Sequence, residues 1–142
     1  MINESLFTIG QLEKDGMISL CWYRQSVSVD TRQRLPNQFI VEWEFSDVQP
    51  NGLPPNEEYE SALELQNMMT NALEADNEAV LAVISTGNGY REWYFYCRNQ
   101  QLLKCRFNAV VNGREFPVEL HAGSDPDWKV YEEFIAPFTD DH

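Results

Sequence analysis

His121 is the residue whose neighbours in sequence could support acid–base chemistry, because the other histidine, His142, is the last residue. Asp125 and Asp127 follow it closely, and an imidazole near carboxylates can act as a general base or bind a metal ion. The order Asp125, Pro126 is also typical of a helix start, since aspartate accepts backbone N–H groups there and proline suits the first helical position. We favour the helix start and keep a ligand or catalytic site near His121 and Asp125 as the alternative.

The three cysteines, Cys21, Cys97 and Cys105, have the spacing of neither a zinc site nor a disulfide framework. Cys97 lies in an apolar stretch, which favours a buried thiol over a reactive one. The glycine-rich segment over residues 85–89 lacks the lysine of a phosphate-binding loop. We therefore expect no catalytic residue, no metal and no cofactor, and we expect reduced cysteines in the cytoplasm.

The charge of the chain restricts its partners. Ten lysines and arginines stand against 23 aspartates and glutamates, which gives a net charge of −13. Nucleic acids and anionic membranes are poor partners for such a chain, because proteins that bind them neutralise phosphates with basic residues. A basic protein is the expected partner, although acidity by itself also keeps a protein soluble.

Patterns of apolar residues predict strands and helices in alternation. Strands are expected over residues 17–26, 39–45, 79–85, 90–98 and 116–121, with a polar loop over 26–37 and a tight glycine turn at 87–89. Helices are expected from a cap at Asn56 to about Ala75, from a cap at Asn99 to about Val111, and from Asp125 to Pro137. Residues 1–16 are weakly periodic and are expected to form an N-terminal arm, and residues 17–142 a single α+β domain.

The elements from Phe39 onward follow the order strand, helix, strand, strand, helix, strand. This order predicts a ferredoxin-like βαββαβ sandwich, in which both helices cover one face of the sheet. The strand over residues 17–26 is an addition whose position the order does not define. Trp128, Tyr131 and Ile135 recur at helical spacing and are expected to dock a short C-terminal helix.

Alternation along the strand over residues 90–98 divides its side chains into two sets. Trp93, Phe95 and Cys97 are expected to face the helices, together with Arg91, whose side chain is expected to extend outward at the end of the strand. The other set is expected on the opposite face, beside residues of two other strands: Tyr90, Glu92, Tyr94 and Tyr96 with Glu42 and Glu44 and, if the register allows, Glu119 and His121.

This tyrosine- and carboxylate-rich face is the candidate partner-binding site. Aromatic side chains on an open sheet can stack nucleic-acid bases, but the acidic residues among them would repel phosphates. Tyrosine suits a protein contact, because it combines a large area with a polar tip. The expected occupant is a basic protein, or a second copy of the chain in a homodimer. The alternative is that residues 1–26 cover this face.

Three segments resemble a bacterial family known as the domain of unknown function 695. They are NGLPPNEEYESALELQNMMTNAL (Asn51–Leu73), STGNGYREWYFYCR (Ser85–Arg98) and FPVELHAGSDPDWKVYEEF (Phe116–Phe134). The shared features are a GLP before an acidic helix start, a glycine turn into a REWYFY-like strand, and a DPxW near the end. The family has no established activity, so the resemblance implies no catalytic residues.

A fold-level similarity extends to the ribonuclease E inhibitor B family, whose members are small, acidic, ferredoxin-like regulators that bind an enzyme. This similarity and the acidic charge lead us to expect a non-enzymatic protein-binding or regulatory module of the inhibitor or immunity type. The alternative is a small ligand-binding domain or enzyme with a site near His121 and Asp125.

Overall fold

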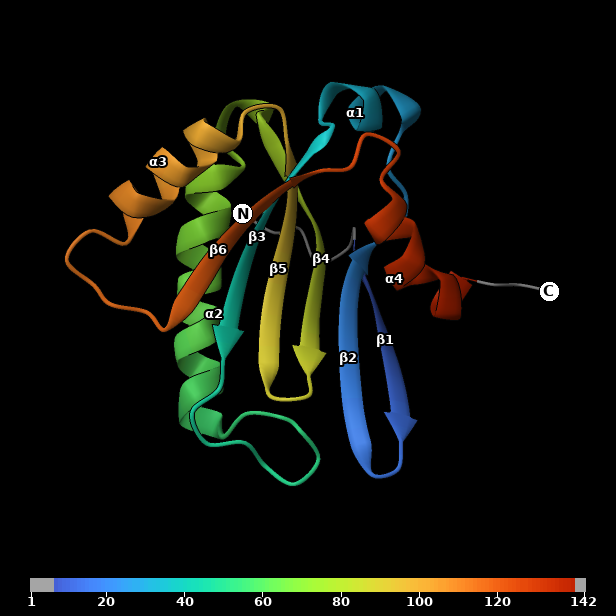
Figure 1. The fold of residues 1–142 in the computed structure, drawn as a ribbon, viewed down its shortest axis with the longest axis vertical. Coiled ribbons are helices and arrows are strands. Elements are labelled where there is room, and N and C mark those ends of the chain that lie inside the picture. The colour runs from blue at the N-terminus through green and yellow to red at the C-terminus, as the bar shows by residue number, and fades with distance from the viewer. Residues whose placement is uncertain (1–6, 140–142) are drawn as a thin grey trace.

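A six-stranded antiparallel sheet forms the centre of the structure, a computed structural model that describes residues 7–139 (Figure 1). The strands are β1 (Phe7–Lys14), β2 (Met17–Arg24), β3 (Asn37–Glu44), β4 (Ala79–Gly87), β5 (Tyr90–Cys97) and β6 (Val118–Ser124). They lie in the order β1-β2-β4-β5-β3-β6. The helices are α1 (Val29–Arg34), α2 (Asn56–Leu73), α3 (Gln100–Val110) and α4 (Lys129–Thr139), with a 3-10 turn, η2, at Ala75–Asn77. Among these helices, none is long and apolar enough to cross a membrane.

The predicted α+β class is confirmed, and so are two local signals. The side chain of Asn99 caps α3 by accepting the N–H of Leu102 at 3.1 Å. The turn between β4 and β5 has Asn88 and Gly89 at positive φ, 54° and 87°, as a tight hairpin requires. The prediction of Asn56 as the cap of α2 is wrong, because the residue before it, a proline, holds the cap position and makes no side-chain bond.

The N-terminal strands form a hairpin that widens the sheet. β1 pairs with β2 along its whole length, beginning with Phe7 opposite Arg24, and β2 pairs with β4. Part of the segment expected as an arm is therefore an edge strand, and residues 1–6 lie outside the described residues. The added strand β2 is separated from β3 by β4 and β5, and Figure 1 shows the hairpin extending the sheet on the side away from β3 and β6.

Two apolar clusters pack on opposite faces of the sheet. On one face, which Figure 1 shows with α2 passing behind the sheet, α2 and α3 cover β3 and β5. This cluster includes Leu65, Met69, Leu103, Phe107, Val41, Trp43, Trp93 and Phe95. On the other face α4 packs against β2, β4 and β5, with Trp128, Tyr131 and Ile135 against Cys21, Tyr23, Val83 and Tyr96. The predicted docking of α4 through Trp128, Tyr131 and Ile135 is confirmed.

The ends of α4 differ from the prediction. The helix begins at Lys129 rather than at Pro126, because Trp128 has a φ of 54° that no α-helical residue adopts. Pro137 lies inside the last turn instead of ending the helix. A proline there removes one N–H bond, to the carbonyl of Glu133, and Glu133 is exposed to water.

The short helix α1 occupies a segment predicted as a polar loop. Its start is fixed by Ser28, whose hydroxyl accepts the N–H of Thr31 at 3.1 Å. The helix has six residues and buries none of them, so it has no apolar periodicity by which the sequence could reveal it.

Candidate functional site

A row of glutamates crosses the sheet on the face opposite α2 and α3. Glu42 of β3 lies opposite Glu92 of β5 on one side and opposite Glu119 of β6 on the other. Glu44 is on the same face of β3 and lies opposite Tyr90. The register that the prediction required for Glu119 is thus confirmed. We call Glu42, Glu44, Glu92 and Glu119 the acidic patch.

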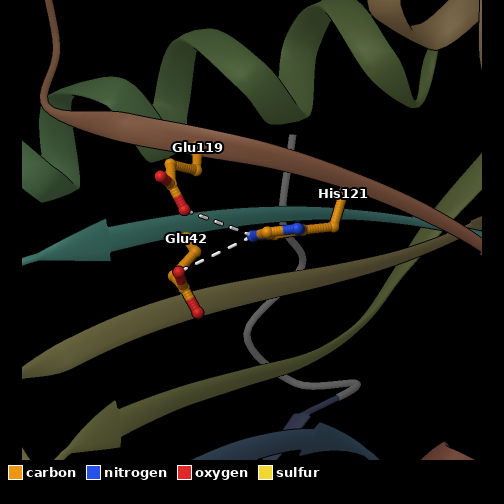
Figure 2. A group of neighbouring side chains, drawn as sticks. All are labelled: Glu42, Glu119 and His121. Carbon is orange, nitrogen blue, oxygen red and sulfur yellow. Dashed lines mark ion pairs between the residues drawn. The ribbon is translucent and has the colours of Figure 1, made fainter.

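His121 of β6 is the basic side chain beside the acidic patch. Its Nε2 atom lies 3.6 Å from Oε1 of Glu42 and 3.8 Å from Oε2 of Glu119, so a protonated imidazole forms ion pairs with both (Figure 2). Figure 2 shows the three side chains converging from β3 and β6. Within residues 7–139, no lysine or arginine forms an ion pair with the acidic patch.

The same three side chains could hold a divalent metal ion. One ligand atom from each of Glu42, Glu119 and His121 lies within 4.8 Å of the other two. An imidazole with carboxylates is a ligand set that zinc accepts. Glu119 and His121 are exposed to solvent, so they lack the buried supporting contacts that fix the ligands of tight metal sites. The geometry thus supports two chemistries, an ion-paired cluster or an open surface metal site.

Burial and neighbouring negative charges raise pKa values in this region. The pKa of Glu92 is raised above its ordinary value, first by burial and then by its hydrogen bond to Glu42 and the charge of Glu42. The pKa of Tyr90 is raised chiefly by the charge of Glu44. Like charges at directly opposite strand positions destabilise a sheet, so the acidic patch opposes folding.

The tyrosines expected on the partner-binding face have different environments. Tyr90 is 37% exposed, at the end of the acidic patch. Tyr94 is half-buried, and its ring meets that of Phe134 in α4 with the centroids 4.9 Å apart. Tyr96 is fully buried and stacks on Trp128 with the centroids 3.9 Å apart. The candidate site therefore loses Tyr96, which α4 covers, and within the part of the chain that the structure describes the cover is this C-terminal helix rather than residues 7–26.

The side chain of Asp125 caps α4, but it does so from four residues before the first helical residue, Lys129, and not from directly before Pro126 as the favoured interpretation held. Its Oδ1 accepts the N–H of Lys129 at 3.0 Å, and its Oδ2 accepts the N–H of Val130 at 2.9 Å. The same Oδ2 accepts the hydroxyl of Tyr96 at 2.6 Å. Asp125 is buried by these contacts, whereas His121 is exposed and lines a separate cavity of about 540 Å³ that Asp125 does not line. The structure does not bring these two residues into one site.

Arg91 corrects another prediction. Its side chain does not extend outward, because it is 1% exposed and enclosed on the face that α2 covers. Nη1 donates to Oγ1 of Thr86 at 2.6 Å, and Nη2 donates to Oε1 of Gln66 at 2.7 Å. Gln66 lies on α2, far from Arg91 in sequence, so local patterning could not reveal this contact.

The thiols of Cys21 and Cys97 are buried, and burial raises their pKa values to about 12 and about 11. Both are therefore protonated at neutral pH and poor nucleophiles, which confirms the expected buried thiol at Cys97. Cys105 is exposed and free.

The protein is of the α+β class, and its six-stranded sheet carries helices on both faces. One face of the sheet also carries a row of glutamates. The chain belongs to a family of unknown function, DUF695, whose model matches residues 7–136. The family membership expected from the three segments quoted above is therefore confirmed. No curated protein and no solved structure matches the chain.

Proposed function

We propose that the protein is a non-enzymatic module that binds a basic protein partner through the acidic patch. The observation that carries this proposal is the position of Glu42, which lies between Glu92 and Glu119 with His121 nearby. A net charge of −13 extends the same field over the molecule. Such a field speeds encounter with a positively charged surface.

The energetics of the sheet support the same proposal. Each pair of like charges at opposite strand positions disfavours folding by roughly 0.2–1 kcal/mol. Lysine and arginine side chains of a partner would offset this repulsion, so the acidic patch gains free energy when it is bound. Tyr90, partly exposed beside Glu44, offers the partner an aromatic contact with a polar tip.

The fold supports a regulatory role. In this proposal residues 37–124 form a ferredoxin-like unit, because β3, α2, β4, β5, α3 and β6 follow its order and β3 lies between β5 and β6. The β1–β2 hairpin and α4 are additions to that unit. Small acidic regulators of this kind, such as the ribonuclease E inhibitor B family, bind an enzyme. We favour an inhibitor- or immunity-type role in a reducing cytoplasm, which suits the free thiols.

Affinity capture from the host cell tests the proposal. The bait proteins are the wild-type chain, the double variant Glu42→Lys with Glu119→Lys, and the control Glu60→Lys with Glu133→Lys. The control changes the net charge equally, at exposed positions on α2 and α4 outside the acidic patch. Captured proteins are compared by mass spectrometry.

A basic protein should be captured by the wild-type chain and by the control, and lost with the Glu42 and Glu119 variant. Capture of the same proteins by all three baits would contradict the proposal, and so would capture of no specific protein by the wild-type chain.

A second candidate function, binding of a divalent cation or small ligand at His121, is favoured by the convergence of His121, Glu42 and Glu119. Calorimetric titration with Zn²⁺ tests it against His121→Ala. Binding at one site that is lost in the variant supports this function. Absence of binding, or equal binding by the variant, excludes zinc from it.

A further inference from the structure

Arg91 is a buried cation without an acidic counterpart. Within residues 7–139, no ion pair includes Arg91. Its hydrogen bonds go to the side chains of Thr86, Gln66 and Tyr59, none of which is a carboxylate. Its Nε is buried and has no hydrogen-bond partner among these residues. A charged group is costly to bury when it is not paired, so this guanidinium lacks an anion.

Aromatic rings around Arg91 provide part of the stabilisation that an acidic partner would give its guanidinium. The guanidinium carbon of Arg91 lies 5.1 Å from the ring centroid of Trp22, 5.3 Å from that of Tyr59 and 5.4 Å from that of Trp93. Cation–π contacts of this kind favour the charged form. Burial lowers the pKa of Arg91 to about 10, which leaves it a cation at neutral pH. The surrounding side chains therefore hold a positive charge in place without neutralising it.

Arg91 lines a cavity of about 390 Å³. The cavity lies between α2 and the β1–β2 hairpin, because both elements contribute lining residues. Its apolar wall consists of Phe7, Ile9, Trp22, Leu63 and Ile84. Ile9 is 61% exposed and stands at the rim, whereas Arg91 is on the buried wall. Few polar groups among apolar walls are typical of a small-molecule site.

We infer that this cavity binds a small monocarboxylate with an apolar body. The carboxylate would accept from guanidinium N–H groups of Arg91 on the cavity wall, and the body would lie against Trp22, Leu63 and Ile84. A planar carboxylate matches the fork of a guanidinium. The site is on the face of the sheet opposite the acidic patch, so it is separate from the proposed partner-binding site.

A phosphate fits this cavity less well than a carboxylate. A phosphate group presents more acceptor oxygens and close to two negative charges. The polar groups of the cavity wall are those of Arg91, Gln66 and Tyr59 and the indole N–H of Trp22, and Gln66 Oε1 is already accepting from Arg91 and from Nε1 of Trp93. The strongly negative net charge also disfavours a multivalent anion.

Binding of 3-phenylpropionate tests this inference, with the uncharged 3-phenylpropionamide as the comparison. Calorimetry at pH 7 should give one saturable site for the carboxylate and affinity at least about tenfold weaker for the amide, because only the carboxylate pairs with the guanidinium. In the NMR spectrum of the labelled protein, the Nε–H resonance of Arg91 and the indole N–H of Trp22 should shift with the carboxylate.

Two variants on one strand localise the site without altering Arg91. Ile9→Asp puts a negative charge at the rim and should weaken 3-phenylpropionate binding about tenfold or more. Leu12→Asp is the matched control, since Leu12 is 48% exposed on the same strand and does not line the cavity. It should bind as the wild-type chain does.

Arg91→Lys adds a third comparison, because lysine keeps the charge and loses the fork. Arg91→Lys should weaken the binding of 3-phenylpropionate. If Arg91→Lys does not fold, the comparison of Ile9→Asp with Leu12→Asp still tests the inference. No binding of the carboxylate at millimolar concentration would overturn the inference. Equal affinity for the amide, or equal binding by the Ile9→Asp and Leu12→Asp variants, would do the same.

Discussion

The hydroxyl of Tyr96 connects the sheet to the start of α4. It donates to Oδ2 of Asp125 at 2.6 Å and accepts from Nε2 of Gln38 at 3.1 Å and from the N–H of Tyr131 at 3.2 Å. Tyr96→Phe would leave these buried groups without a partner, and we expect the free energy of unfolding to fall by about 1–3 kcal/mol. Urea denaturation measures the change. Tyr90→Phe is the control, and an equal effect of the two substitutions would show that this network is not stabilising.

Glu92 provides a test of charge crowding. Its pKa is raised in the folded chain, first by burial and then by Glu42, while Tyr94 and the charge of His121 act in the opposite direction. The folded state therefore takes up a proton before the unfolded state as the pH falls. Stability should increase as the pH drops through the raised pKa toward the ordinary value of 4.5.

Glu92→Gln should flatten this pH dependence and increase the free energy of unfolding at pH 7 by about 0.5–1 kcal/mol, because it removes one of two opposing charges. Urea denaturation between pH 4.5 and pH 7 measures both effects. The control is Glu60→Gln, at an exposed position on α2. Lower stability of Glu92→Gln at pH 7 would refute the claim that charge crowding opposes folding.

At the scale of elements, α4 is held against the sheet by a close approach at Gly10 of β1. A Cβ atom at Gly10 would lie 2.3–2.6 Å from three ring atoms of Phe138, which is closer than carbon atoms can approach. Gly10→Ala should therefore lower the free energy of unfolding by about 1–3 kcal/mol.

A double-mutant cycle with Phe138→Ala checks the cause of this destabilisation. If the clash with Phe138 is responsible, Gly10→Ala should cost much less in the Phe138→Ala background than in the wild-type chain. Equal costs in both backgrounds, measured by thermal or urea denaturation, would mean that β1 and α4 do not press on each other at this point.

The sequence predicts the elements of this fold better than their arrangement. Side chains along β3 and β5 alternate clearly between the two faces of the sheet, and Asn99 and Asp125 are local signals of helix caps. The prediction of these elements therefore needed only residues that are neighbours in sequence. β1 has no such signal, since as an edge strand it leaves Ile9 and Leu12 exposed. The choice of α4 as the cover over Tyr94 and Tyr96 depends on contacts between distant segments, which local patterns do not encode.

The residues of the candidate sites likewise include some that local patterns predict and others that depend on distant contacts. Alternation along β3 and β5 correctly placed Glu42, Glu44 and Glu92 on one face, and the register added Glu119. Alternation also placed Arg91 on the helix-covered face, but it could not show that Gln66 and Thr86 would enclose its side chain there. The one signal in the sequence was a charged residue, Arg91, on an otherwise apolar face of β5. The burial of Arg91 makes the cavity beside it a candidate ligand-binding site.

At the scale of the whole molecule, the two proposed sites lie on opposite faces of the sheet. The acidic patch lies on one face beside α4, and the Arg91 cavity lies on the other, between α2 and the β1–β2 hairpin. Negative charge is exposed at the first and a positive charge is buried at the second. This separation predicts that 3-phenylpropionate binding is unchanged by Glu42→Gln with Glu119→Gln, measured by calorimetry. A large change in affinity would mean that the two faces are coupled.

The most direct test of the proposed function is the dissociation constant for the variant Glu42→Gln with Glu119→Gln, measured with the basic protein that the wild-type chain is expected to capture. We expect this variant to bind at least about tenfold more weakly than the wild-type chain, because interfacial charge pairs are removed. Glu60→Gln with Glu133→Gln, which changes the net charge equally, should bind as the wild-type chain does. Equal dissociation constants for the wild-type chain and the neutralised variant would contradict the claim that the acidic patch binds the partner.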